Sequence, residues 1–253
     1  MSTLLLHSEH WRHVKISSYF LSAYLLQPLI NSGAQLPLLK SLTLGRGRLN
    51  VVLDFPMTCA NLKSLTLNRL GLELQFPRPT ITRLVLRGMS CESALGVISH
   101  CPNVQDVVLR ELERGPDLPT PAHKCNANKL ELSSSYNTQS AISTLLPGIH
   151  FDQLTSLNIH DDGSARQSDW YDVCLMLERS PTNLTSLRLH LNLKPFSFNR
   201  VVYVFSRMPL LTELEVGEWP YQRCGIYPIL KSLIASQTSD ANMGGVSDSV
   251  AHY

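Results

Sequence analysis

The sequence is short of charged residues. Only 17% of its 253 residues are Asp, Glu, Lys or Arg, and the formal net charge is +2. Soluble domains usually carry about a quarter of charged residues. A nearly neutral chain lacks the strongly basic surface typical of nucleic-acid-binding proteins, so we expect no nucleic-acid partner.

Cysteine pairs and catalytic motifs are also missing. The six cysteines are too sparse for a disulfide scaffold in a chain of this length, and none forms the C-x-x-C pair of a zinc ribbon. The sequence contains no G-x-x-x-x-G-K-[ST], G-x-G-x-x-G, G-x-S-x-G or H-E-x-x-H motif. We therefore expect no enzyme activity, no cofactor and no metal site.

Long apolar runs are absent as well. The best candidate, residues 19–30, is interrupted by Gln27 and Pro28 and is shorter than the roughly 18 apolar residues that a membrane helix needs. The first apolar run, residues 4–6, is too short for the apolar core of a secretory signal. These features predict an intracellular protein, in the cytoplasm or nucleus, with no membrane partner.

Leucine, by contrast, is abundant, with 44 residues of 253. The sequence LKSLTL at residues 39–44 recurs unchanged at 62–67, and its skeleton L-x-x-L-x-L returns along the chain. Chance alone gives several such matches in so apolar a chain, so the prediction depends on the spacing. Strict and degenerate copies begin at residues 11, 39, 62, 81, 104, 127, 154, 184 and 211. Their average interval, 25 residues, lies within the range of about 20–29 residues for leucine-rich repeats.

The motif predicts a strand whose alternate apolar residues face a shared core. Stacked copies predict an α/β leucine-rich-repeat solenoid of about nine irregular repeats over residues 1–236, with a parallel sheet on the concave side. Residues 237–253 are small and polar and predict a disordered tail. Apolar spacings of three and four predict outer helices. The ranges are 17–31, 90–100, 138–146, 168–179, 198–207 and 226–235, whereas the prolines of 110–126 predict an extended loop.

Many leucine-rich repeats carry an asparagine three residues after the last leucine of the strand. Only Asn192 occupies that position here, so the regular asparagine ladder is missing. The variable repeat length and the helical outer layer resemble intracellular leucine-rich repeats instead.

Two segments resemble a more specific family. Residues 6–16 (LHSEHWRHVKI) and 36–44 (LPLLKSLTL), with later entries such as CPNV at 101–104 and MPLL at 208–211, resemble fungal F-box proteins of the mushroom-forming lineage. In that family a similar strand follows the F-box and begins the repeats. The resemblance implies the substrate receptor of a cullin–RING ubiquitin ligase, with a protein partner.

The F-box itself would lie before residue 6, so we expect the ligase adaptor as a partner only if an F-box precedes this chain. No residue here takes over the adaptor contact. The alternative is a stand-alone cytosolic leucine-rich-repeat protein that acts as a scaffold or inhibitor.

The residues between the inward leucines predict the partner-binding surface on the concave face. We single out Arg83, Arg87, Asp106, Arg110, Lys129, Glu131, Asn158, His160, Arg188, His190, Glu213 and Glu215. Arg83, Arg87 and Arg110 fall on two neighbouring predicted strands, and such a cluster of arginines suits an anionic group of a partner. The alternative is a solvated face on which Asp106 and Glu131 neutralise them.

Two histidines, His160 and His190, fall at equivalent positions of adjacent repeats. They predict a side-by-side pair, either a metal-binding or pH-sensitive pair or simply two solvent-facing rings. Cys59 and Cys101 precede strands and are expected to pack beneath the repeat. Trp11 is expected to pack against the first end of the core, and Trp219 and Tyr221 to cover the last strand.

Overall fold

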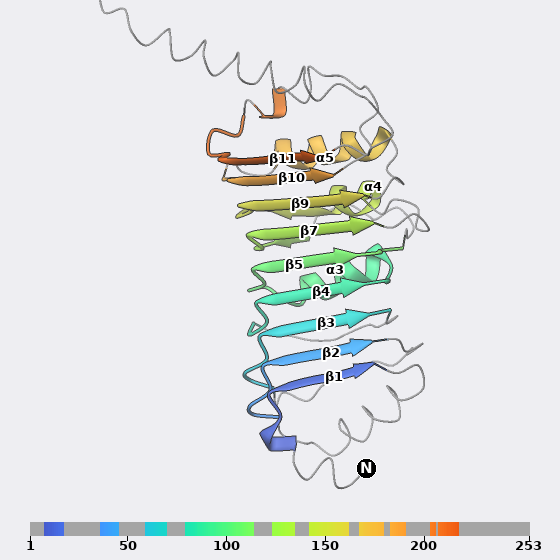
Figure 1. Ribbon diagram of the computed structural model, residues 1–253, viewed down its shortest axis with the longest axis vertical. Coiled ribbons are helices and arrows are strands. Elements are labelled where there is room, and N and C mark those ends of the chain that lie inside the picture. The colour runs from blue at the N-terminus through green and yellow to red at the C-terminus, as the bar shows by residue number, and fades with distance from the viewer. Residues whose placement is uncertain are drawn as a thin grey trace, which may run out of the picture.

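The computed structural model describes residues 8–17, 36–45, 59–69, 79–113, 123–134, 142–161, 167–179, 183–190, 203–205 and 207–217. In this part of the chain nine strands form one parallel sheet, and the chain is an α/β protein. The strands are β1 (His13–Ser17), β2 (Ser41–Gly45), β3 (Ser64–Asn68), β4 (Arg83–Arg87), β5 (Asp106–Arg110), β7 (Lys129–Ser134), β9 (Ser156–Asp161), β10 (Ser186–His190) and β11 (Glu213–Gly217). Figure 1 shows them stacked in chain order along the long axis.

Every copy of the motif produces a strand. Each of the nine strands begins two residues after the first residue of a copy, as β2 does after Leu39 and β10 after Leu184. The predicted parallel sheet is therefore confirmed.

Neighbouring strands pair so that equivalent motif positions lie opposite each other. Leu42 is opposite Leu65 and Leu44 is opposite Leu67, and the same register continues to β11. The three apolar residues of each inner copy are almost fully buried, as Leu39, Leu42 and Leu44 illustrate. The leucines therefore form continuous rows behind the sheet. At the two end strands the motif residues, including Trp11 and Leu211, are only partly buried against this core, as predicted for Trp11.

The helices α3 (Cys91–Ser99), α4 (Ile142–Leu145) and α5 (Gln167–Arg179) lie behind the sheet in Figure 1. The helix α3 matches the prediction for 90–100. Ser90 caps its first turn by accepting a hydrogen bond from the Ser93 amide at 3.2 Å, and Leu95 and Ile98 are buried. The helix α5 matches the prediction for 168–179.

One expectation needs correction and another is confirmed only in part. Residues 123–125, expected to belong to an extended loop, form β6 (His123–Cys125), which pairs in parallel with β8 (Ile149–Phe151) in a second sheet. A strand of three residues is too short to show an alternating pattern, although Cys125 and Phe151 are buried. The helix expected over 138–146 is described only from Ile142 and passes at Leu146 into the 3₁₀ turn η2 (Leu146–Gly148), where Pro147 follows.

Other expectations fall outside the described residues. These are the helix expected over 17–31, apart from Ser17, which ends β1 instead, the helix expected over 226–235, the tail at 237–253, and Trp219 with Tyr221. Of the helix expected over 198–207, residues 203–205 are described and are helical. No helix in the described part of the chain combines the length and apolar character required to cross a membrane.

One backbone carbonyl joins each repeat to the next. It belongs to the second residue of the motif and accepts two amides, as when Arg12 O accepts from Lys40 N at 2.8 Å and Ser41 N at 3.1 Å. The same arrangement recurs at all eight junctions between strands of the large sheet. Four threonines at this second position add a hydroxyl donor to the carbonyl of the preceding repeat. They are Thr82, Thr155, Thr185 and Thr212, at 3.3, 3.0, 3.1 and 3.1 Å.

A column of asparagines lies just before the strands. Asn61, Asn103 and Asn126 each precede a motif by one residue. Their side-chain amides donate to the carbonyls of Pro37, Pro79 and Pro102 in the preceding repeat, at 2.6, 2.9 and 3.0 Å. Thr80 occupies the same place in the fourth repeat, but its buried Oγ1 has no hydrogen-bond partner in the described structure.

The substitution Thr80→Asn is expected to complete this column. By analogy with its neighbours, the new amide reaches the carbonyl of Ala60, so the free energy of unfolding rises by about 0.5–1.5 kcal/mol. Asn103→Ala, the matched control, lowers it by a similar amount. Urea unfolding followed by circular dichroism measures both. The account is contradicted if Thr80→Asn does not raise the free energy of unfolding and Asn103→Ala does not lower it. The asparagine column would then not hold the repeats together.

Candidate functional site

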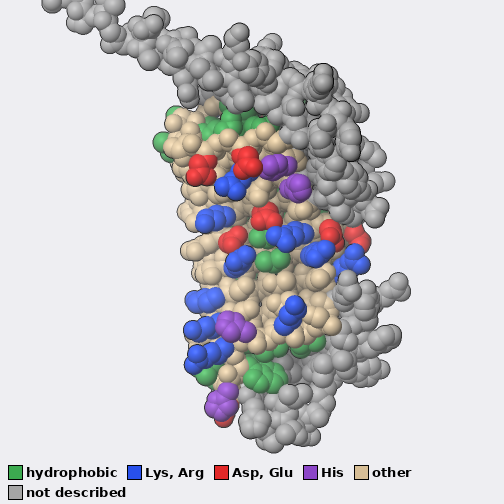
Figure 2. All heavy atoms as spheres, viewed as in Figure 1, with side chains coloured by type: hydrophobic (Ala, Val, Ile, Leu, Met, Phe, Trp, Pro, Cys, Tyr) green, Lys and Arg blue, Asp and Glu red, His purple; other side chains and the backbone are tan. Residues whose placement is uncertain are grey.

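The face of the sheet opposite the leucine rows, called here the open face, carries three rows of mostly polar side chains (Figure 2). The in-register pairing creates the rows, because motif positions three, five and seven repeat on successive strands. All twelve residues predicted for partner binding lie on it. Arg83, Asp106, Lys129 and Glu213 are in the first row, Glu131, Asn158, Arg188 and Glu215 in the second, and Arg87, Arg110, His160 and His190 in the third.

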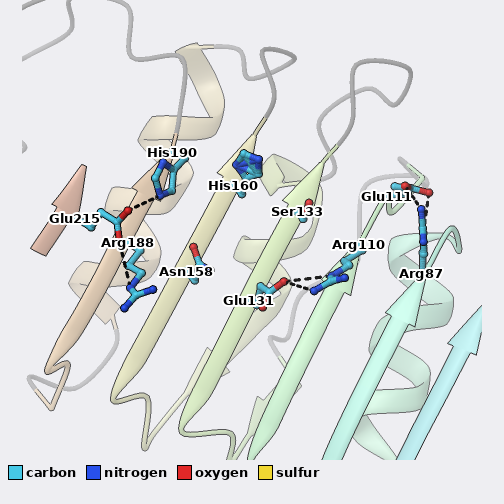
Figure 3. A pocket seen from close by; sticks show the side chains of 10 residues that line it. All are labelled: Arg87, Arg110, Glu111, Glu131, Ser133, Asn158, His160, Arg188, His190 and Glu215. Atoms are coloured by element: carbon cyan, nitrogen blue, oxygen red, sulfur yellow. Dashed lines mark hydrogen bonds and ion pairs between the residues drawn. The ribbon is translucent and has the colours of Figure 1, made fainter. Parts of the chain in front are cut away.

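A hollow of about 560 Å³ lies over the second and third rows between β4 and β11 (Figure 3). Its lining consists of Arg87, Arg110, Glu111, Glu131, Ser133, Asn158, His160, Arg188, His190 and Glu215. Eight of the predicted residues are among them, whereas Arg83, Asp106, Lys129 and Glu213 lie outside.

Sequence analysis missed Glu111 and Ser133. Ser133 occupies the seventh motif position beside Arg110, so the repeat phase would have identified it. Glu111 follows the end of β5 and reaches the hollow because its backbone adopts a left-handed conformation with φ of 50°. Nothing in the local sequence indicates that conformation for a glutamate.

Ion pairs neutralise the arginines of the open face. Arg87 donates to both carboxylate oxygens of Glu111, and Arg110 donates through Nε and Nη2 to Glu131 Oε1 at 3.2 and 2.7 Å. Arg83 Nε lies 3.4 Å from Asp106 Oδ2. The pairs with Asp106 and Glu131 favour the neutralised face over an arginine cluster awaiting an anion.

Glu111 lies at the centre of a cluster of arginines. The hydrogen bond from Arg87 lowers the pKa of Glu111, and the charges of Arg87, Arg69 and Arg110 lower it further against the opposing effect of burial. The same hydrogen bond raises the pKa of Arg87. Both groups therefore remain charged at neutral pH.

The left-handed backbone at the strand exits builds this cluster. Arg69, Gly88 and Glu111 directly follow β3, β4 and β5, and all have positive φ. Each donates its amide to the carbonyl of the seventh motif residue on the neighbouring strand, as Glu111 N does to Ser133 O at 2.8 Å. A side chain at Gly88 would collide with the side chain of Arg69. The glycine therefore leaves room for Arg69 to extend toward Glu111, where Arg69 Nη2 lies 3.8 Å from Glu111 Oε2.

The two predicted histidines do lie side by side. His160 is opposite His190, and their rings meet edge to face with centroids 5.6 Å apart. His190 Nε2 is 3.2 Å from Glu215 Oε1, and Arg188 Nε is 3.4 Å from Glu215 Oε2 (Figure 3). Gly217 is opposite His190, and any side chain there would overlap the imidazole.

Among the residues with described placement, no three His, Cys, Asp or Glu side chains gather in a way that would hold a metal ion. The histidine pair lies on the polar open face, with Glu215 as the carboxylate partner of His190.

Cys59 and Cys101 are buried beneath their repeats, as predicted. Val108 occupies the fifth motif position on β5 and lies on the open face, between Val85 and Glu131. It is only 4% exposed, although the residues between the inward leucines are expected to face solvent.

No family model matches the chain, and no curated protein matches it either. The repeat pattern and the open face are therefore the basis for assigning a function.

The ion pair at Glu111 predicts a pH-dependent stability. Because folding lowers the pKa of Glu111, the pair stabilises the fold above the ordinary value of about 4.5, and this contribution is lost as the pH falls through the lowered value. We expect Glu111→Gln to be less stable than the original protein at pH 7 by about 1 kcal/mol or less, because the pair is partly exposed.

Urea unfolding at neutral and acidic pH checks this expectation. The difference between the two proteins should shrink as the pH falls below the ordinary value. Glu213→Gln, which removes an exposed carboxylate with no ion pair among the described residues, is the matched control and should change stability little. A deficit in Glu111→Gln that persists unchanged in acid would contradict the role given to its charge.

Proposed function

We propose that this chain is a leucine-rich-repeat solenoid whose open face binds a segment of another protein. The observation that supports it is the continuity of the polar rows over nine in-register strands. The helices α3, α4 and α5 lie on the other side, and no described element covers the rows (Figure 1).

The dimensions and chemistry of the face suit a polypeptide. At about 4.8 Å per strand, nine strands extend over roughly 40 Å, the length of an extended segment of about twelve residues. Paired guanidinium and carboxylate groups offer both donors and acceptors along this path. Such a mixed surface matches the peptide groups and polar side chains of a protein partner.

The specific form of this proposal comes from the resemblance to fungal F-box proteins. In that reading the repeats recognise a substrate for a cullin–RING ubiquitin ligase, and the bound segment belongs to a protein that receives ubiquitin. The second candidate is a stand-alone scaffold or inhibitor, which uses the same face without a ligase.

Site-specific photo-crosslinking in cells of the source organism tests the binding face. A photoreactive residue replaces Asn158 in the hollow or, as the matched control, Glu92 on the exposed side of α3. We expect a discrete crosslinked protein from position 158 and none from position 92. Equal products from the two positions, or none from position 158, would contradict the proposed face.

Affinity purification of the natural gene product separates the two candidates. A ligase substrate receptor co-purifies with the adaptor subunit and cullin, and the protein crosslinked at position 158 accumulates when the gene is deleted. A stand-alone binding protein yields the same crosslink without the adaptor, and deletion leaves the abundance of the partner unchanged.

A further inference from the structure

Three basic side chains form a column at the end of the sheet where the strands begin. Arg12, Lys40 and Lys63 are the second motif residues of the first three repeats. The register places them on adjacent strands, because the residues that follow them, His13, Ser41 and Ser64, are paired with one another. Successive members are therefore about 4.8 Å apart at the backbone. All three are exposed, and we call them the basic column.

The fold itself does not use these side chains. In four later repeats the same position holds a threonine, whose hydroxyl bonds to the preceding repeat. The basic residues contribute only their backbone groups to that ladder. None of the three forms an ion pair with a residue of the described ranges. Like charges on adjacent strands repel each other, so the column is a cost to stability that folding does not explain.

Charge is divided along the length of the sheet. The described residues of the first three repeats include Arg12, Lys15, Lys40, Lys63 and Arg69. The one acidic residue among them, Glu9, lies beside His10. At the other end, Glu213 and Glu215 on β11 are exposed. Figure 2 shows the same division, with blue side chains along the lower left edge of the sheet and most red ones in the upper half.

We propose that the basic column binds an acidic segment, rich in Asp and Glu, of the partner protein. The segment runs along the open face across the strands, with its acidic end over β1–β3. This inference rests on the proposed function and adds the chemistry and direction of the partner. Ammonium and guanidinium groups that have no carboxylate partner among the described residues are suited to bind carboxylates from another chain.

The observations favour a protein over a nucleic acid. A phosphate backbone following the same path would gain no net attraction from the neutral middle of the face, where Glu111 and Glu131 pair with arginines, and would meet the exposed Glu213 and Glu215 on β11. Single-stranded nucleic acids also need aromatic side chains on which bases stack. The described positions of the open-face rows hold no Phe, Tyr or Trp. A polypeptide can instead be acidic at one end and neutral or basic at the other.

Fluorescence anisotropy with the full chain tests this inference. The probe is a labelled peptide of about twelve residues with aspartates in its first half and serine and glycine in its second. At about 150 mM salt, where distant charges are screened, we expect the triple variant Arg12→Glu/Lys40→Glu/Lys63→Glu to bind it about tenfold or more weakly than the original chain. The charge-preserving variant Arg12→Lys/Lys40→Arg/Lys63→Arg is expected to retain binding. Gln105→Glu changes the second motif residue of the fifth repeat, outside the basic column, and is expected to change the affinity little.

Two results overturn the inference. One is peptide binding that is unchanged in the triple glutamate variant while its thermal unfolding matches that of the original chain. The other is an oligothymidylate of equal charge that binds more tightly than the peptide, which indicates a nucleic-acid surface. If the triple variant fails to fold, the single neutral variant Lys40→Gln replaces it, with a smaller expected loss of affinity.

The crosslink at position 158 separates this inference from the proposed function. Introducing the triple glutamate change into that protein should reduce the yield of crosslinked partner. A full yield would overturn the basic column alone and leave the binding face intact. If the original chain forms no crosslink specific to that face, the proposed function itself fails.

Discussion

The backbone pairing between equivalent residues of successive repeats is the interaction on which the rest of this structure depends. At each junction one carbonyl, that of the second motif residue, accepts two amides from the next repeat. This arrangement fixes the register, and a shift of one residue would turn every leucine toward solvent. The buried leucine rows, the threonine and asparagine ladders and the rows of the open face all follow from that register.

The same register brings together residues that are distant in sequence. Arg110 and Glu131 are 21 residues apart, yet they share a hydrogen-bonded pair because one repeat separates them. In the middle of the open face each arginine is thus held by a carboxylate, whereas Arg12, Lys40 and Lys63 in the first three repeats form no ion pair with the described residues. A partner of the kind proposed here is oriented by this difference, since only one end of the face attracts its acidic residues.

The phase of the leucine motif was sufficient to predict the strands, their order and the contact between His160 and His190. A single L-x-x-L-x-L motif is weak evidence for a strand, but nine copies at an average interval of 25 residues are strong evidence for a stacked sheet. Features that the leucine motif does not encode were not predictable. The strands β6 and β8 are too short for a periodic pattern, and the left-handed turn that directs Glu111 into the hollow depends on a tertiary hydrogen bond. The sequence alone shows that Arg12, Lys40 and Lys63 are basic. That the fold has no use for these side chains follows from the structure, because four other repeats have a threonine at this position that bonds to the preceding repeat.

Engineered disulfides test the in-register stacking most directly. The pair His160→Cys and His190→Cys places thiols on adjacent strands, about 4.8 Å apart at the backbone and within reach of a disulfide. The pair Ser133→Cys and His190→Cys lies two strands apart, about 9.6 Å, which is too far. Under mild oxidation, peptide mapping by mass spectrometry should find the 160–190 crosslink and no 133–190 crosslink. A 133–190 crosslink, or the absence of the 160–190 crosslink, would contradict the account.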